Sequence, residues 1–218
     1  IYCQNGTGNS KPCTFQADPQ YVDYPISEST ITAWKDEAAA ATPASGSITL
    51  NGGSLTIGPK KINGDITLTG GAVLTVSGTL WVTGNINMTG NNTQIRLSAS
   101  YGESDGVVVS DGIVSIGGGA DATGSGDPDS YIMLLTTSSS TSAVSMSGGS
   151  GAVIMYAHNG TVNVAGGADV QEVTANRLVI SGGSTVNYDS GLQNASFSSG
   201  PAMTALIAPH VTTWKETQ

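Results

Sequence analysis

The sequence predicts an all-β protein, a single-stranded parallel β-helix of about seven coils with one N-terminal capping α-helix. Two observations predict this fold: a repeated five-residue pattern with glycine turns, and a regular spacing between its copies. The pattern is apolar, any residue, apolar, any residue, glycine. Its first apolar positions are Ile48, Ile66, Ile86, Val114, Val144, Val162 and Leu178. The closing glycines are Gly52, Gly70, Gly90, Gly118, Gly148, Gly166 and Gly182.

The alternation within each copy is typical of a strand with aliphatic side chains on one face and short polar side chains on the other. Glycine at a fixed offset suits a corner where the backbone adopts a positive φ. Most copies begin 16 to 20 residues apart, which fits one coil of a solenoid whose coils bury their apolar faces against each other. The repeat therefore predicts stacked coils with an aliphatic ladder inside.

Two further strand columns are predicted beside the repeat. Apolar runs before it, such as Met133–Leu135, predict a second column, and alternating residues after it, such as Leu74 and Val76, predict a third. Three columns imply a roughly triangular cross-section. Two coils lengthen to 28 and 30 residues, and their surplus near Ser98 to Asp105 and Asp121 to Ser130 predicts two protruding loops.

One helix is predicted over residues 27–42. Ser27 is a suitable N-cap, and Ile31, Trp34 and Ala38 fall on one helical face. We expect that face to cover an end or a side of the solenoid, because an open β-helix exposes unpaired strand edges.

The chain is long enough for one solenoid domain with flanking parts. These parts are a disulfide-containing segment at 1–26, the capping helix at 27–42, the β-helix at 43–190 and a C-terminal cap at 191–218. Cys3 and Cys13 lie in a polar stretch outside the repeats and form either a small disulfide-bonded loop or two free thiols. We expect the disulfide, and with it an oxidising, extracellular location.

Charge and hydropathy narrow the classes of partner. A net charge of −9 with only seven Lys and Arg residues provides no basic stripe, which argues against nucleic acids and anionic membrane surfaces. The chain contains no apolar run long enough to span a membrane and does not begin with a secretion signal, so we expect a mature or excised portion without direct membrane insertion.

Catalytic residues are not predicted. The carboxylates considered for glycoside hydrolysis are Asp65, Asp105, Asp111 and Asp169. They hold different positions relative to the corners, and turn formation explains them better. A lyase would need basic residues near its acidic sugar, and the chain has only Arg96 and Arg177. His158 and His210 belong to no nucleophile motif, so we expect them at corners or on the surface. We therefore predict a non-enzymatic protein without a cofactor.

One metal site is considered. Asp121, Asp127 and Asp129 lie in the second long loop and could supply the hard oxygen ligands that Ca²⁺ prefers. Their spacing matches no EF-hand loop, and solvated turn aspartates are the alternative explanation.

The outward positions of the repeat predict a ligand face. They form a hydroxyl–amide ladder of Thr49, Thr67, Asn87, Ser115, Ser145 and Asn163. Short polar groups at regular spacing could bind a repetitive ligand, either a glycan or an ice lattice. The same composition also suits a solvated solenoid face, and ice binding would favour a more uniform threonine array.

Four segments carry a family resemblance. They are Gly58-Pro59-Lys60-Lys61-Ile62, Gly78 to Ile86, Ser130 to Leu135, and Tyr188-Asp189-Ser190-Gly191-Leu192. Together with the Cys3 to Cys13 segment and Trp214-Lys215-Glu216, they resemble repeat-bearing surface proteins predicted from candidate-phyla bacteria (Patescibacteria). The resemblance covers nearly the whole chain and implies a β-helical surface protein, often with a pilin-like or membrane-anchored N-terminus. It implies no catalytic residue. Relatives tend to carry paired asparagines at the coil tip, where this chain mostly has paired glycines.

These inferences predict an extracellular module of a bacterial surface or pilus-associated protein, serving as a stalk, an adhesin or an assembly subunit. Its expected partners are a glycan or a surface protein, and self-association is a further possibility. The alternatives are a β-helix polysaccharide lyase or glycosidase, and an ice-binding protein.

Overall fold

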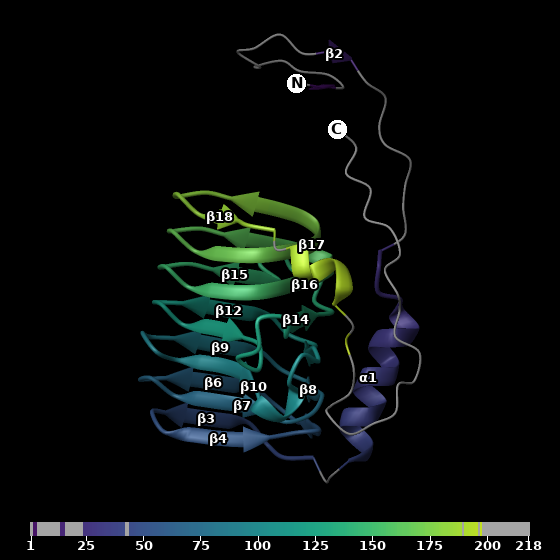
Figure 1. The fold of residues 1–218 in the computed structure, drawn as a ribbon, viewed down its shortest axis with the longest axis vertical. Helices are drawn as coiled ribbons and strands as arrows, with labels where there is room; N and C mark the ends of the chain where they lie inside the picture. Colours follow the sequence, from purple (N-terminus) through teal and green to yellow (C-terminus); the bar gives the residue numbers. More distant parts are fainter. Residues whose placement is uncertain are drawn as a thin grey trace.

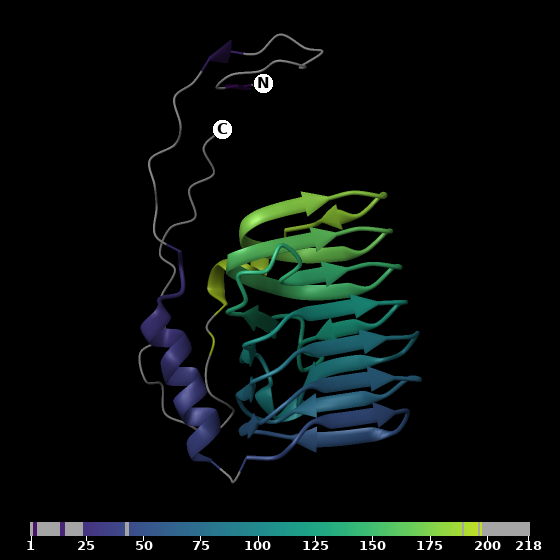
Figure 2. The same cartoon turned by 180° about the vertical axis from the view of Figure 1, so that it is seen from behind.

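The structure is a computed structural model that describes residues 2–3, 14–15, 24–41, 44–188, 190–195 and 197. It shows a parallel β-solenoid with a helix along one flank (Figures 1 and 2). The predicted fold class is confirmed.

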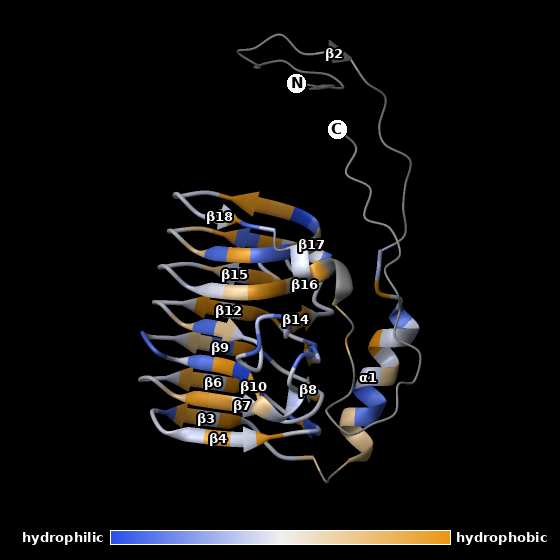
Figure 3. Ribbon diagram, viewed as in Figure 1, coloured by the Kyte–Doolittle hydropathy of each residue, from blue (hydrophilic) through white to orange (hydrophobic). Residues whose placement is uncertain are grey.

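The repeat forms the first strand column. This column stacks β3 (Ile48–Asn51), β6 (Ile66–Thr69), β9 (Ile86–Thr89), β12 (Val114–Gly117), β15 (Val144–Met146) and the second parts of β16 (Gly151–Val164) and β17 (Asp169–Ile180). All pairs are parallel and join equivalent positions, such as Ile66 with Ile86 and Val144 with Val162. These side chains are fully buried in one continuous core. Figure 3 shows the hydrophobic residues repeating through the stacked strands of this column.

Two other columns complete each coil, as predicted. One contains β5 (Lys60–Ile62), β8 (Leu80–Val82), β11 (Gly106–Ser110), β14 (Ile132–Thr136) and the middle parts of β16 and β17. The other contains β4 (Ser54–Ile57), β7 (Val73–Val76), β10 (Gln94–Leu97), β13 (Asp121–Thr123), the first residues of β16 and β17, and β18 (Thr185–Val186). The remaining elements are the paired β1 (Tyr2–Cys3) and β2 (Thr14–Phe15), and the 3₁₀ helices η1 (Ala99–Tyr101) and η2 (Ser190–Asn194).

Paired glycines turn the chain from the first column into the column of β4 and β7. At the turn after β6, Gly70 and Gly71 have φ values of 62° and 77°, a region that costs other L-residues free energy. Equivalent pairs with positive φ close the turns at 52–53, 118–119, 148–149, 166–167 and 182–183. The tip glycines therefore provide the left-handed corners that the repeat predicts.

The two insertions are exposed over much of their length, as expected of loops, and they also form hydrogen bonds with each other. Ser125 Oγ donates to the Gly102 carbonyl at 2.6 Å, and Ser130 Oγ donates to the Ser104 carbonyl at 2.8 Å. Asp105 is buried and accepts the Tyr131 backbone N–H at 2.7 Å. These contacts satisfy backbone groups that would otherwise need solvent, and they tie the two insertions into one layer.

Helix α1 (Glu28–Ala40) covers a side of the solenoid and not its end (Figure 2). Ser27 is the N-cap and its hydroxyl accepts the Thr30 N–H, as predicted. Ile31, Trp34 and Ala38 are buried, and the helix contacts β5, β8 and β11. Within the described residues, no helix has both the length and the apolar character needed to cross a membrane.

Polar contacts attach α1 to the coils, among them one at Asp111 and one at His158. Asp111 accepts hydrogen bonds from Lys35 Nζ at 2.5 Å and from Trp81 Nε1 at 2.8 Å. His158 lies 2.5 Å from a Glu28 carboxylate oxygen, and its side chain is only 7% exposed. His158 lies at a corner, as expected, because the register of β16 shifts between Ala157 and Thr161. The expected surface position is corrected, since the residue is buried beneath the N-terminal turn of α1.

Candidate functional site

The predicted hydroxyl–amide ladder exists as a continuous outward row. Thr49, Thr67, Asn87, Ser115, Ser145 and Asn163 pair one above another in register, and Val179 follows them. Within this row, Asn163 Nδ2 donates to the Thr141 carbonyl at 3.1 Å. The row lies on one strand column and therefore offers regularly spaced polar groups.

The predicted calcium ligands do not converge. Asp121 begins β13, whereas Asp127 and Asp129 belong to the loop that follows. The Asp127 carboxylate accepts the Asp129 N–H at 3.1 Å, which closes a local turn. Among the described residues, no three His, Cys, Asp or Glu side chains form a group that could hold a metal ion. The calcium prediction is corrected on this ground.

Each of the four carboxylates considered for catalysis accepts a hydrogen bond from a described residue. Asp65 accepts the Asn85 N–H at 2.7 Å across a corner. Asp105 accepts the Tyr131 N–H, and Asp111 accepts a hydrogen bond from Lys35 of α1. The fourth, Asp169, differs because it points outward from the solenoid into a groove.

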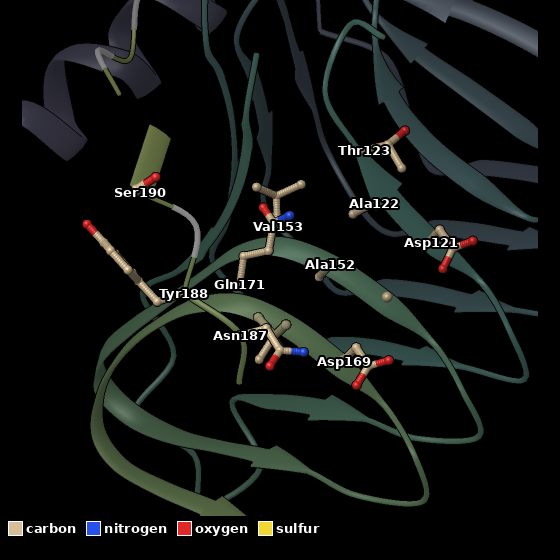
Figure 4. Close-up of a pocket in the computed structure, with 12 residues that line it drawn as sticks. Asp121, Ala122, Thr123, Ala152, Val153, Asp169, Gln171, Asn187, Tyr188 and Ser190 are labelled. Atoms are coloured by element: carbon tan, nitrogen blue, oxygen red, sulfur yellow. The ribbon is translucent and has the colours of Figure 1, made fainter. Parts of the chain in front are cut away.

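The candidate functional site is this groove, which we call the upper groove. Its volume is about 590 Å³. It is lined by Asp121, Ala122, Thr123, Gly151, Ala152, Val153, Asp169, Val170, Gln171, Asn187, Tyr188 and Ser190 (Figure 4). The lining comes from β13, β16, β17, the two residues after β18 and the start of η2, so three successive coils and the following segment build it. Pockets of this size with a few polar groups are common ligand sites.

Two aspartates frame one end of the upper groove. Asp121 pairs with Gly151, and Gly151 pairs with Asp169, so the two aspartates lie two strands apart. Their backbones are therefore about 9.5 Å apart. Gly151 has no side chain to fill the space between them, and the Asp121 carboxylate reaches into that space. A Cβ added at Gly151 would meet Asp121 Oδ1 at 2.8 Å. Asp169 also accepts a hydrogen bond from the Thr185 hydroxyl.

The far end of the upper groove carries an aromatic ring and an amide. Tyr188 is 51% exposed and lies across the groove from the two aspartates (Figure 4). The exposed Asn187 lies nearer Asp169 (Figure 4), and its Nδ2 donates to the Thr185 hydroxyl at 3.0 Å. The side-chain oxygen of Gln171 is buried and accepts no hydrogen bond from the described residues. A buried acceptor without a partner costs free energy, and a ligand donor would offset that cost.

The sequence contained a signal for this site that the repeat analysis missed. Asp121, Gly151, Asp169 and Thr185 are each the second residue after a pair of glycines. That shared offset places them in one row. Their unequal separations along the chain hid the relation, because the coil between Asp121 and Gly151 contains an insertion.

Next to the groove, Glu172 is a half-buried carboxylate. Burial raises its pKa from 4.5 to about 7. The folded state therefore binds this proton more tightly than the unfolded state, so stability is greatest below about pH 4.5 and falls as pH rises to about 7. The loss in unfolding free energy is on the order of 1–3 kcal/mol, and we expect Glu172→Gln to remove it. Urea titrations at pH 5 and pH 8 measure the difference. An equal pH dependence in both proteins would contradict this assignment.

Comparisons with protein-family models, with curated proteins and with solved structures find no match.

Proposed function

We propose that the protein is a non-enzymatic, extracellular module of a bacterial surface or pilus-associated structure, and that its upper groove binds a neutral glycan. The observation that carries this proposal is the groove itself, which combines an exposed aromatic ring with amide, hydroxyl and carboxylate groups. The sequence resemblance to surface proteins and the low content of charged residues, 11%, support the location.

The chemistry of the lining favours a sugar over an apolar ligand. Tyr188 offers a flat face for the C–H side of a pyranose ring, while its hydroxyl remains in water. Asp121 and Asp169 accept hydrogen bonds from sugar hydroxyls, and Asn187 and Gln171 both donate and accept. Sugars need such a mixed set, because each ring has apolar C–H faces and polar edges.

The charge of the lining selects against acidic glycans. Asp121 and Asp169 are the charged residues of the upper groove, and no Lys or Arg lines it. The chain as a whole carries a net charge of −9. A uronate or sialate would therefore meet like charge in a partly desolvated site, whereas a neutral hexose polymer would not.

The stack of coils supports a role in presentation. Parallel pairing continues without interruption from β3 to β17 in the first column. Such a ladder makes a stiff rod, and the groove lies toward its C-terminal end, at the level of β16 to β18 (Figure 1). A rod with a recessed binding site near one end is the geometry of an adhesin or a stalk module.

A glycan array followed by calorimetry tests the proposal. We expect binding to neutral polysaccharides, and we expect Gly151→Val and Tyr188→Ala each to weaken it at least about tenfold. Gly46→Val is the matched control, because a Cβ at Gly46 meets nothing within 4 Å. Circular dichroism confirms that each variant is folded. Absence of binding above background, or binding unchanged by both groove variants, would overturn the proposal.

A second candidate function, an inverting glycosidase, rests on the two carboxylates that line one groove. Asp121 and Asp169 stand two strands apart in the same row, and an inverting enzyme needs two carboxyl groups on either side of the scissile bond. Sustained release of reducing ends from a neutral polysaccharide, abolished by Asp121→Asn and by Asp169→Asn, would establish hydrolysis and replace the binding proposal. Binding without product release retains the non-enzymatic module.

A further inference from the structure

The C-terminal end of the solenoid has an open core. Leu178 and Ile180 continue the inward rows of the first column, where the preceding residues Val162 and Val164 are fully buried. Leu178 is nevertheless 42% exposed and Ile180 is 48% exposed, because no described coil lies above them. In the neighbouring column, Val186 of β18 is 37% exposed. We call the surface of Leu178, Ile180 and Val186 the open end.

The opposite end of the solenoid begins the same rows. Three inward rows run through the coils, and each begins and ends with an aliphatic residue. Their first and last residues are Ile48 and Leu178, Leu50 and Ile180, and Leu55 and Val186. The first residues are only partly buried, whereas Ile66, Leu68 and Leu74 in the coil above are fully buried. Both ends therefore leave the same apolar rows incompletely covered.

The strand edges at the two ends also match. Among the described strands, β3 pairs only with β6, β4 pairs only with β7, and the first-column part of β17 pairs only with β16. All these pairs are parallel, so a second copy moved along the rod axis would present β3 to β17 in the same direction and register. Unpaired edges of this kind accept a further strand. Helix α1 lies beside the stack and not across either end (Figure 1).

The two ends carry opposite formal charge. The first coil, residues 44–64, contains Lys60 and Lys61 and no Asp or Glu, which gives a formal charge of +2. The last coil, residues 165–188, contains Asp169, Glu172 and Arg177, which gives a formal charge of −1. Opposite charges favour contact between unlike ends over contact between like ends.

We propose that copies of this chain bind head to tail, and that β3 and β4 of one copy add to β17 and β18 at the open end of the next. The contact pairs the first and last residues of the three inward rows and continues the parallel ladder across the junction. Because the two surfaces differ, each bound copy leaves one surface of each kind free, and the contact builds a filament. The inference does not depend on glycan binding.

The junction also accommodates the inward charge of the first coil. Lys60 of β5 occupies the inward row that Leu80 continues, and burying its ammonium against apolar side chains would cost free energy. The last described coil ends at β18 and adds no strand to the second column above β17. A gap about one strand wide therefore separates the middle part of β17 from β5 of the added copy, and the ammonium stays hydrated there.

Cysteine cross-linking tests the register of the contact. In the outward row, Val179 of one copy pairs with Thr49 of the next, about 4.8 Å away. A disulfide needs Cα atoms roughly 4.4–6.8 Å apart, so we expect mixed Val179→Cys and Thr49→Cys copies to link under mild oxidation. Mass spectrometry of the linked peptides identifies the bond. Asn163→Cys is the matched control, because it lies one strand further from Thr49, at about 9.6 Å.

Sedimentation velocity at several concentrations measures the association. We expect the sedimentation coefficient of the wild type to rise with concentration, and Leu178→Asp/Ile180→Asp to weaken association at least about tenfold. Asn87→Asp/Ser115→Asp is the matched control. It adds the same charge to the outward row in the middle of the solenoid and should leave association unchanged. Circular dichroism confirms that each variant is folded.

Three results would overturn the head-to-tail contact. A wild type that stays monomeric at every concentration would assign the open end to a different occupant. Cross-linking that is as efficient with Asn163→Cys as with Val179→Cys would remove the register. Equal association of the wild type and the Leu178→Asp/Ile180→Asp variant would place the contact elsewhere on the molecule.

Discussion

Ile86→Ala is expected to lower the free energy of unfolding by about 2–5 kcal/mol. Ile86 is fully buried between Ile66 and Val114 in the inward row of the first column. The truncation leaves a cavity that two neighbouring coils line, and the parallel ladder prevents those coils from closing it. The measurement is urea denaturation followed by circular dichroism.

The control for Ile86→Ala is its neighbour in the same strand. Asn87 points outward, so Asn87→Ala should change stability by no more than about 0.5 kcal/mol. A similar loss in both variants would contradict the inward and outward alternation of β9, and with it the core.

Gly112→Ala is expected to destabilise the protein by about 1–3 kcal/mol. A Cβ at Gly112 would lie 2.6 Å from the Gly84 carbonyl oxygen and 2.7 Å from its carbon. Both atoms belong to the backbone of the coil below, so the stack must separate locally to accept one methyl group. Thermal denaturation followed by circular dichroism measures the loss.

The matched control is Gly46→Ala. Gly46 holds the equivalent corner position in the first coil, where an added Cβ meets nothing within 4 Å. We expect it to leave the melting temperature unchanged. Equal effects at the two corners would contradict the contact between coils as the cause of the loss.

The solenoid could be predicted from the sequence because its determinants are local. Alternation within each strand and glycine at a fixed offset both act within five residues, and every coil repeats them. The helix was predictable for the same reason, since Ser27 and the face of Ile31, Trp34 and Ala38 lie within four turns.

The contents of the site were harder to predict because they depend on contacts between coils. Asp121 and Asp169 face the same groove because Gly151 pairs with both of them and places them in one row. The packed insertions depend on hydrogen bonds between residues more than 20 positions apart, such as that from Ser125 to Gly102. The burial of His158 was not predicted, because its partner, Glu28, lies 130 residues away. The predicted Cys3–Cys13 disulfide remains a prediction, since Cys13 lies outside the described residues.

The register of the coils is the premise on which the core, the corner contacts and the upper groove all depend. Paired nitroxide labels on the outward row measure it directly by pulsed electron paramagnetic resonance. With one label at Thr49 and the second at Ser115, Ser145 or Asn163, the row predicts three, four and five steps of about 4.8 Å each.

The decisive comparison is between two increases in the label-to-label distance, from Ser115 to Ser145 and from Ser145 to Asn163. From Ser115 to Ser145 the chain adds 30 residues, and from Ser145 to Asn163 it adds 18. In-register coils predict the same increase of about 5 Å for both, with narrow distance distributions. Increments that differ with chain length, or broad distributions, would contradict the stacked solenoid.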